Sequence, residues 1–432
     1  MEQDQVKQFQ AGAISVHVIP STTFKTNTIV IQMNGALEKD TVTKRALLPN
    51  ILENGTKEYP SRQHIRSALE ELYGASLVAD VAKKGERQVL SFRMDIANEK
   101  FLKDKNPLLE KGLKLLSSVL LDPKIENDQF DAKIIEEQKR THHQKIASLF
   151  DDKMRFANKR LTEEMCQKEP FGLHVLGYEK DLDAIDGTNL YDYYKQSLNN
   201  DQIDLYVMGD VDVEEIKGLI GRYFSIDQPN DSENNTPAKE TVPYSEKKAN
   251  EVVDEQSVQQ GKLHIGYRTN VTYGDEDYFA LQLFNGVFGG FSHSKLFVNV
   301  REKASLAYYA ASRVESHKGL LIVMSGIESN KYDEATEIIF KQMEDMKQGN
   351  FTEEDIEQTK AVYKNQVLET MDVPRGRIEL EYHNQITSKP TPVNEWLQRI
   401  DNVTYDDILN VAKKIQLDTI YFLKGKGADT NE

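Results

Sequence analysis

Residues 404–425 read TYDDILNVAKKIQLDTIYFLKG, an amphipathic helical run followed by a β-rich run that ends in glycine. Ile408, Val411 and Ile415 recur at the spacing of one helix face. A second unit that also runs from threonine to glycine, TNLYDYYKQSLNNDQIDLYVMG, lies 216 positions earlier at residues 188–209. Because 216 is half of the 432-residue chain, we predict an internal duplication of one fold.

Strands and helices occur in groups within each half. Apolar and polar residues alternate over segment 90–96, which predicts a half-buried strand, and segments 15–19 and 28–33 are rich in β-forming residues. Segment 61–74 has apolar residues at helical spacing, and Thr352 is placed to cap another helix. We therefore predict an α+β fold of two homologous domains, each a mostly antiparallel sheet covered by helices.

One stretch near the middle of the chain breaks this pattern. Residues 227–241 read DQPNDSENNTPAKET and contain no large apolar side chain, so they cannot bury a face against a core. We predict an N-terminal domain at residues 1–226, a linker at 227–247 and a C-terminal domain at 248–432.

Composition excludes several classes of function. The chain has 54 Lys and Arg against 70 Asp and Glu, a net charge of −16, which argues against nucleic acid and against an anionic membrane surface. No secretion signal and no apolar run of membrane-spanning length is present, so we expect a soluble cytoplasmic protein. The single cysteine, Cys166, excludes an internal disulfide and a cysteine-based zinc finger.

Two short polar patterns are candidates for chemistry. In residues 48–56, LPNILENGT, the side chains of Asn50, Glu53 and Asn54 share one helix face. With histidine at both asparagines this would read His-x-x-Glu-His, which binds Zn²⁺ and activates water. On the residues alone, helix capping is favoured, with Asn50 as an N-cap or with Asn54 and the next glycine ending the helix.

A pair of adjacent histidines, His142 and His143, lies in a helical stretch without metal-binding neighbours. We expect both to lie on a solvated helix face.

The wider sequence resembles the pitrilysin/insulinase metallopeptidase family, which includes the mitochondrial processing peptidases. The resemblance runs from about residue 12 to 425. It includes the segments that follow the asparagine pattern, a glycine element, a closing strand and a second-half signature close to Arg-Glu-Lys-x-Gly-Leu-Ala-Tyr: YPS (59–61), EELYGA (70–75), FG (171–172), GYE (177–179), LYVMGDVD (205–212), FNGVFGG (284–290) and VREKASLAY (300–308).

The resemblance places Asn50 and Asn54 where the family has its two histidine ligands, and Glu53 at the general base. It places Lys145, or with less support Gln144, at the third ligand. Carboxamide oxygens suit Ca²⁺ better than Zn²⁺, and a lysine repels a cation. We therefore expect no metal and no cofactor in this chain, with zinc only in a partner chain.

The resemblance also implies a second group of site residues. Arg301 and Tyr308 match the pair that binds substrate carbonyls and supports the oxyanion, here in trans to another chain's zinc. The alternative is a surface ion pair for Arg301 and core packing for Tyr308. Gly286, Gly289 and Gly290 match the substrate-contacting loop of the non-catalytic processing-peptidase subunit, or form only a tight turn.

These departures lead to a hypothesis about function. We predict an inactive zinc-metallopeptidase homologue that serves as the non-catalytic, substrate-binding subunit of a two-chain peptidase, so catalysis by this chain alone is not expected. Its partners would be a zinc-bearing sister chain and a peptide substrate, with a homodimer possible when it is alone. The alternatives are a peptide-binding or scaffolding protein without a peptidase partner, and an active zinc peptidase whose ligands lie elsewhere.

Overall fold

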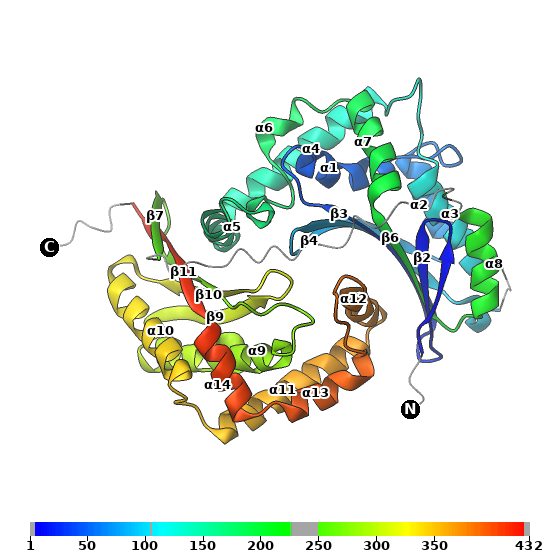
Figure 1. Cartoon of the computed structure of the whole chain (residues 1–432). Helices are drawn as coiled ribbons and strands as arrows, with labels where there is room; N and C mark the ends of the chain where they lie inside the picture. The colour runs from blue at the N-terminus through cyan, green and yellow to red at the C-terminus, as the bar shows by residue number, and fades with distance from the viewer. Residues whose placement is uncertain (1–4, 104–105, 225, 227–248, 427–432) are drawn as a thin grey trace. The chain divides into compact units, whose positions relative to one another are not determined.

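The computed structural model describes residues 5–103, 106–224, 226 and 249–426 (Figure 1). The predicted linker, residues 227–247, lies outside the described residues. The chain divides into two compact units. The first unit contains the residues up to Ser148 and those from Leu173 to the central gap in the described chain, and the second contains Leu149–Gly172 and the residues after that gap.

The first unit is built on a six-stranded sheet in the order β1-β2-β6-β3-β5-β4. All neighbouring strands are antiparallel except β2 and β6, which run parallel. The strands that the sequence predicted at 15–19, 28–33 and 90–96 are confirmed as β2, β3 and β5, each longer than expected. The strands are β1 (Lys7–Ala11), β2 (Ile14–Pro20), β3 (Thr26–Ala36), β4 (Ser76–Lys84), β5 (Arg87–Ala97) and β6 (Gln202–Gly209).

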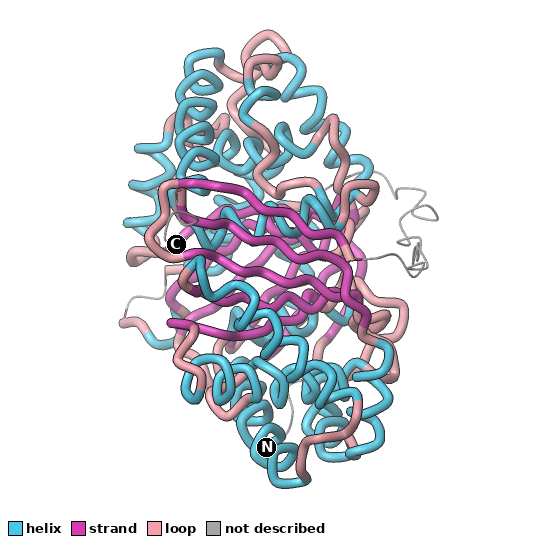
Figure 2. Tube along the Cα trace, turned by 90° about the vertical axis from the view of Figure 1, so that its left-hand side faces the viewer, coloured by secondary structure: helices cyan, strands magenta, loops and turns pink. Residues whose placement is uncertain are grey.

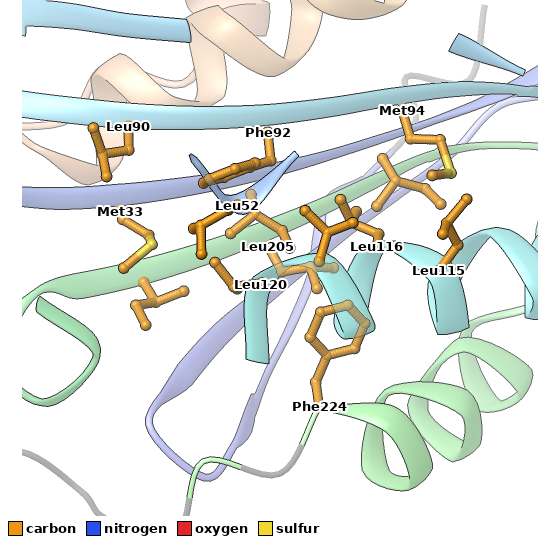
Figure 3. Packing of buried hydrophobic residues seen from close by; sticks show 14 of the residues in the cluster. Met33, Leu52, Leu90, Phe92, Met94, Leu115, Leu116, Leu120, Leu205 and Phe224 are labelled. Carbon is orange, nitrogen blue, oxygen red and sulfur yellow. The ribbon is translucent and has the colours of Figure 1, made fainter. Parts of the chain in front are cut away.

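Helices cover one face of this sheet. Figure 3 shows Leu90, Phe92 and Met94 of β5 on the side of the sheet where Leu115 and Leu116 of α3 lie, all of them buried. Every second residue of β5 and the residues of one face of α3 therefore pack in the same hydrophobic core. The helices are α1 (Val42–Leu52), α2 (Arg62–Glu71), α3 (Leu108–Leu121), α4 (Ala132–Asp151), α6 (Glu179–Leu182), α7 (Gly187–Asn200) and α8 (Val213–Tyr223).

The second unit has a five-stranded sheet in the order β7-β11-β8-β10-β9. Only β7 and β11 run parallel. Its strands are β7 (Asn250–Gln256), β8 (Gly261–Arg268), β9 (Ala307–Glu315), β10 (Leu320–Ile327) and β11 (Gln416–Gly425). Its helices are α5 (Lys153–Met165), α9 (Tyr278–Asn285), α10 (Tyr332–Lys347), α11 (Glu353–Met371), α12 (Pro374–Gln385), α13 (Trp396–Asn402) and α14 (Tyr405–Lys414).

The two sheets share one topology. If β2–β6 and β7–β11 are each numbered one to five in chain order, both sheets read 1-5-2-4-3, with the first and fifth strands parallel and the others antiparallel. Strand β1 is an addition at the edge of the first sheet. Figure 2 distinguishes the strands from the helices that flank them. The predicted α+β fold with two similar, mostly antiparallel sheets is confirmed.

The two helix–strand units on which the predicted duplication rests differ at their caps. Thr404 caps α14 and forms a reciprocal capping box with Asp407, as a threonine at this position favours. In the first unit, Asp186 is the cap of α7, and its box partner is Asn189. The helix therefore begins at Gly187, one residue before the threonine of the repeated unit, because the carboxylate of Asp186 accepts a hydrogen bond from the backbone N–H of Asn189.

The segment Leu149–Gly172 belongs to the second unit although it lies within the first half of the sequence. Its helix α5 buries Ala157, Leu161 and Met165 against apolar residues of β10 and β11. A β-carbon at Gly266 on β8 would lie 2.1 Å from the sulfur of Met165, so a larger residue there would force the Met165 side chain of α5 to move. Within the described part of the chain, no helix is long and apolar enough to cross a membrane.

Candidate functional site

The asparagine pattern lies at the C-terminal end of α1. The helix ends at Leu52, and Glu53 still has helical backbone angles. Asn50, Glu53 and Asn54 therefore lie around the last turn of this helix. The side-chain amide of Asn54 donates a hydrogen bond to the backbone carbonyl of Asn50 at 2.5 Å. Asn54 thus satisfies one of the carbonyl groups left free at a helix end. The helix-ending interpretation is confirmed for Asn54, whereas Asn50 lies inside the last turn and is not an N-cap.

Glu53 is half-buried beside this turn. Burial raises the pKa of its carboxyl group, and three neighbours partly oppose that effect: a backbone hydrogen bond from Ala79 and the charges of Arg62 and Lys145. Ala79 belongs to β4, the strand at the edge of the first sheet. The carboxylate that would act as general base in a zinc peptidase is therefore held by a backbone N–H group and by cations.

Helix α4 supplies the position expected for a third ligand. Lys145 is exposed on α4 and close enough to Glu53 for its charge to act on that carboxyl group. Gln144, the less favoured position, is also exposed.

These residues do not fit a zinc ion. The amide of Asn54 is used inside the helix end, and an ammonium group approaches from α4 where a metal needs an electron-pair donor. Among the described residues, no group of three His, Cys, Asp or Glu side chains is arranged to hold a metal ion.

The two histidines of α4 have different surroundings. His143 is exposed and contacts Glu179, as expected for a solvated face. His142 is buried, its Nε2 lies 2.8 Å from the carbonyl oxygen of Leu176, and burial lowers its pKa. The expectation of a solvated His142 is therefore wrong, because the chain around Leu176 covers that side of α4 and a helical wheel cannot report such a contact.

Arg301 and Tyr308 lie in the second unit, on either side of a tight turn. Arg301 is on a π-helical segment, η5 (Phe297–Lys303), and its guanidinium lies 4.6 Å from the centre of the Phe297 ring. Ser305 adopts a positive φ of 53°, which turns the chain into β9. Tyr308 is 80% exposed near the start of that strand, so the core-packing alternative for Tyr308 is wrong.

The surface ion pair considered for Arg301 is not formed with any residue that the structure describes. The role of Phe297, whose ring stacks on the Arg301 guanidinium, was not predicted from the sequence. Its position four residues before Arg301 was the available signal, since residues at that spacing meet on a helix.

The three glycines form a π-helical turn, η4 (Gly286–Gly290), directly after α9. Gly286 and Gly289 are buried, whereas Gly290 is exposed. A β-carbon at Gly289 would lie 2.4 Å from the hydroxyl oxygen of Ser312 and 2.8 Å from its backbone nitrogen, on β9. Close packing thus accounts for glycine at 289, independently of any contact with a substrate.

Comparison with known proteins gives a consistent result. Residues 184–363 match the family described as "Peptidase M16 inactive domain". The chain is 51% identical over 416 residues, 96% of each chain, to a Bacillus subtilis (strain 168) protein named "Probable inactive metalloprotease YmfF". It is 22% identical to the "Uncharacterized zinc protease YmxG" of the same organism, over 66% of this chain and 69% of that one.

A solved structure has the same fold. A conserved protein from Enterococcus faecalis V583 is 32% identical and superposes with a TM-score of 0.88, covering 99% of this chain and all of that one. The chain therefore belongs to the M16 (pitrilysin/insulinase) peptidase family, as a homologue of its probable inactive members.

Proposed function

We propose that this chain is the non-catalytic, substrate-binding subunit of a two-chain peptidase whose sister chain carries the zinc. The observation that carries the proposal is the contrast between its two sites. In the first unit, the ligand positions are occupied by a helix-ending amide and a lysine. In the second unit, Tyr308 is exposed to solvent, and the Arg301 guanidinium lies over the Phe297 ring with its N–H donors available.

Strand β9 supports peptide binding next to Tyr308. In the described sheet, β9 pairs with β10 on one side and forms the edge on the other. An edge strand offers backbone N–H and C=O groups to which an extended peptide can add as a further strand. The Arg301 guanidinium carries five N–H donors and the Tyr308 hydroxyl one, which suits carbonyl oxygens of a bound peptide and a developing oxyanion.

The zinc-bearing partner would be a chain similar to YmxG. Relatives of this chain that are named an inactive metalloprotease and a zinc protease both occur in B. subtilis. One such pair would place a complete zinc site and an Arg–Tyr pair on two separate chains. Without such a partner, the same surface would serve peptide binding or scaffolding alone.

The test is peptide cleavage by this chain purified together with a YmxG-like chain from the same genome. Tyr308→Phe keeps the ring and removes the hydroxyl, so turnover should fall by about 100- to 1,000-fold while the two chains still associate. Arg301→Ala should raise KM as well as lower kcat, because carbonyl binding acts in the ground state too.

The neighbouring Tyr309 provides the matched control. It lies on the same strand but is half-buried, so Tyr309→Phe should leave turnover within about threefold of the unmodified complex. Failure of the chains to co-purify, or full turnover by Tyr308→Phe in an intact complex, would contradict the proposed function.

A further inference from the structure

Phe297 lies outside the hydrophobic cores, which is unusual for a half-buried phenylalanine. It is the first residue of η5. Among the residues that the structure describes, it is not part of a hydrophobic core cluster and is not packed against one. Its ring meets no other described ring, and its one ring contact is with the guanidinium of Arg301, 4.6 Å from the ring centre. Core packing therefore does not account for a phenylalanine at this position.

The backbone that carries Arg301 is held by contacts that do not involve this ring. Val300 is fully buried in the core of the second unit. The side-chain amide of Asn299 donates a hydrogen bond to Oε1 of Gln342 on α10 at 2.9 Å, which fastens η5 to that helix. The backbone N–H of Leu306 donates to the carbonyl of Val300 at 3.2 Å and closes the turn into β9. These contacts fix the backbone but leave the long, exposed Arg301 side chain free to rotate.

The Phe297 ring supplies the missing constraint on this side chain. An aromatic ring attracts a guanidinium through its π-face and accepts no conventional hydrogen bond. A carboxylate at the same place would also hold the guanidinium, but it would occupy two of the N–H donors. Arg301 has no hydrogen bond or ion pair with any residue that the structure describes. The ring contact therefore orients the cation while its N–H groups stay available to an outside acceptor.

From the ring outside the cores, the fixed backbone and the available donors, we propose that Phe297 is a positioning residue, which orients Arg301 to bind the carbonyl groups of a peptide. This inference rests on the proposed function, because it assigns carbonyl binding to Arg301. A side chain that is ordered before the substrate arrives loses less conformational entropy on binding. An exposed contact of this kind corresponds to a change of about 2- to 5-fold in affinity.

The test uses peptide cleavage by the two-chain complex. Phe297→Leu keeps an apolar side chain but removes the π-face, so KM should rise by about 2- to 5-fold, with a smaller change in kcat. Phe297→Met removes the face with a more flexible side chain and should give the same result, so the test does not depend on one variant. Phe297→Tyr keeps the face and should restore KM to within about 1.5-fold of the unmodified complex.

A double-mutant cycle separates positioning from direct contact with the substrate. Arg301→Ala alone should raise KM by about tenfold or more, because a charged donor to the substrate is lost. If Phe297 acts only through Arg301, adding Phe297→Leu to Arg301→Ala should change KM by less than about 1.5-fold. A ring that contacted the peptide itself, or that only stabilised the fold, would keep its effect in this background.

Phe340 provides the matched control. It is another half-buried phenylalanine of the second unit, but its ring packs against the hydrophobic core. Phe340→Leu should therefore leave KM within about 1.5-fold of the unmodified complex. Far-UV circular dichroism and co-purification verify that each variant is folded and assembled.

The possible failures of the inference and of the proposed function are distinguishable. If Arg301→Ala raises KM but Phe297→Leu and Phe297→Met do not, the positioning role is overturned and the proposed function stands. The same holds if Phe297→Tyr is as impaired as Phe297→Leu, or if the effects of Phe297→Leu and Arg301→Ala on KM multiply in full. Unchanged kinetics in Arg301→Ala, or two chains that do not co-purify, would overturn both.

Discussion

Replacing Glu169 should loosen segment 149–172 from the sheet of the second unit. The Glu169 carboxylate accepts a hydrogen bond from Nη2 of Arg268 at 2.7 Å and pairs with Nζ of Lys318 at 2.5 Å. Its side chain is only 13% exposed. Arg268 also pairs with Asp418 of β11 at 2.9 Å, so Glu169 connects its segment to three strand ends or turns of the second unit.

The expected loss in free energy of unfolding follows from the burial of the ion pair and from the partners that Arg268 keeps after the substitution. Removing one partner of a buried ion pair destabilises a protein by about 3–5 kcal/mol, because it leaves a buried charge uncompensated. In Glu169→Ala, Arg268 keeps Asp418 and the carbonyl of Met165. We therefore expect the lower end, about 3 kcal/mol. Glu169→Gln keeps the shape and one acceptor, and should lose about half of that.

Urea unfolding followed by Trp396 fluorescence reads the second unit directly, since Trp396 is part of its core. With a slope of about 1–3 kcal/mol per molar urea, Glu169→Ala should lower the midpoint by about 1 M or more. Glu334→Gln is the control: Glu334 pairs with Lys331 at 3.0 Å but is 53% exposed, and such surface pairs contribute less than about 1 kcal/mol.

The effect should depend on pH. Burial alone would raise the pKa of Glu169, but hydrogen bonds and charges from Arg268 and Lys318 outweigh it, so the folded-state pKa lies below the ordinary value of 4.5. The stabilisation is therefore complete above about pH 5 and is lost as the pH falls through the lowered pKa. Two results would refute this reasoning. One is a urea midpoint for Glu169→Ala that is no lower than that for Glu334→Gln. The other is a difference in urea midpoint between the unmodified chain and Glu169→Gln that stays constant down to pH 3.

Two further predictions concern the candidate sites. The double variant Asn50→His, Asn54→His should bind Zn²⁺ weakly, and adding Lys145→Glu should tighten binding because it removes a cation near Glu53. The measurement is the zinc retained after dialysis. Equal retention by the double and triple variants would show that Lys145 is not the third-ligand position. Gly289→Ala should lower the urea midpoint of the second unit, because its β-carbon would lie 2.8 Å from the backbone nitrogen of Ser312; an unchanged midpoint would show that the turn adapts.

Local patterns predicted most of the elements correctly. Period-two alternation found β5, and the threonine cap found the start of α11 at Glu353, where Thr352 and Asp355 form a reciprocal box. These signals are reliable because they depend on neighbouring residues and on one buried face. The repeated helix–strand unit predicted two similar sheets for the same reason, although the cap of α7 is Asp186.

Side-chain environments at the sites were predicted less well. The sequence indicated that Asn50, Glu53 and Asn54 share a face, but the hydrogen bond from Asn54 to the carbonyl of Asn50 depends on where α1 ends. Burial of His142 depends on a chain segment more than 30 residues away. No periodicity contains such information.

The sequence by itself predicted two similar halves, and its resemblance to the family predicted that the metal ligands are replaced and that an Arg–Tyr pair is retained. Only the tertiary structure decided that segment 149–172 packs in the second unit and that Tyr308 is exposed. It alone also decided that Arg45 of α1 is buried and forms an ion pair, with its Nη2 atom 2.6 Å from Oδ2 of Asp201. The physical reason is range. Caps, turns and amphipathic faces are set by residues within one or two helical turns, whereas burial and ion pairing are set by residues that meet only after the sheets have formed.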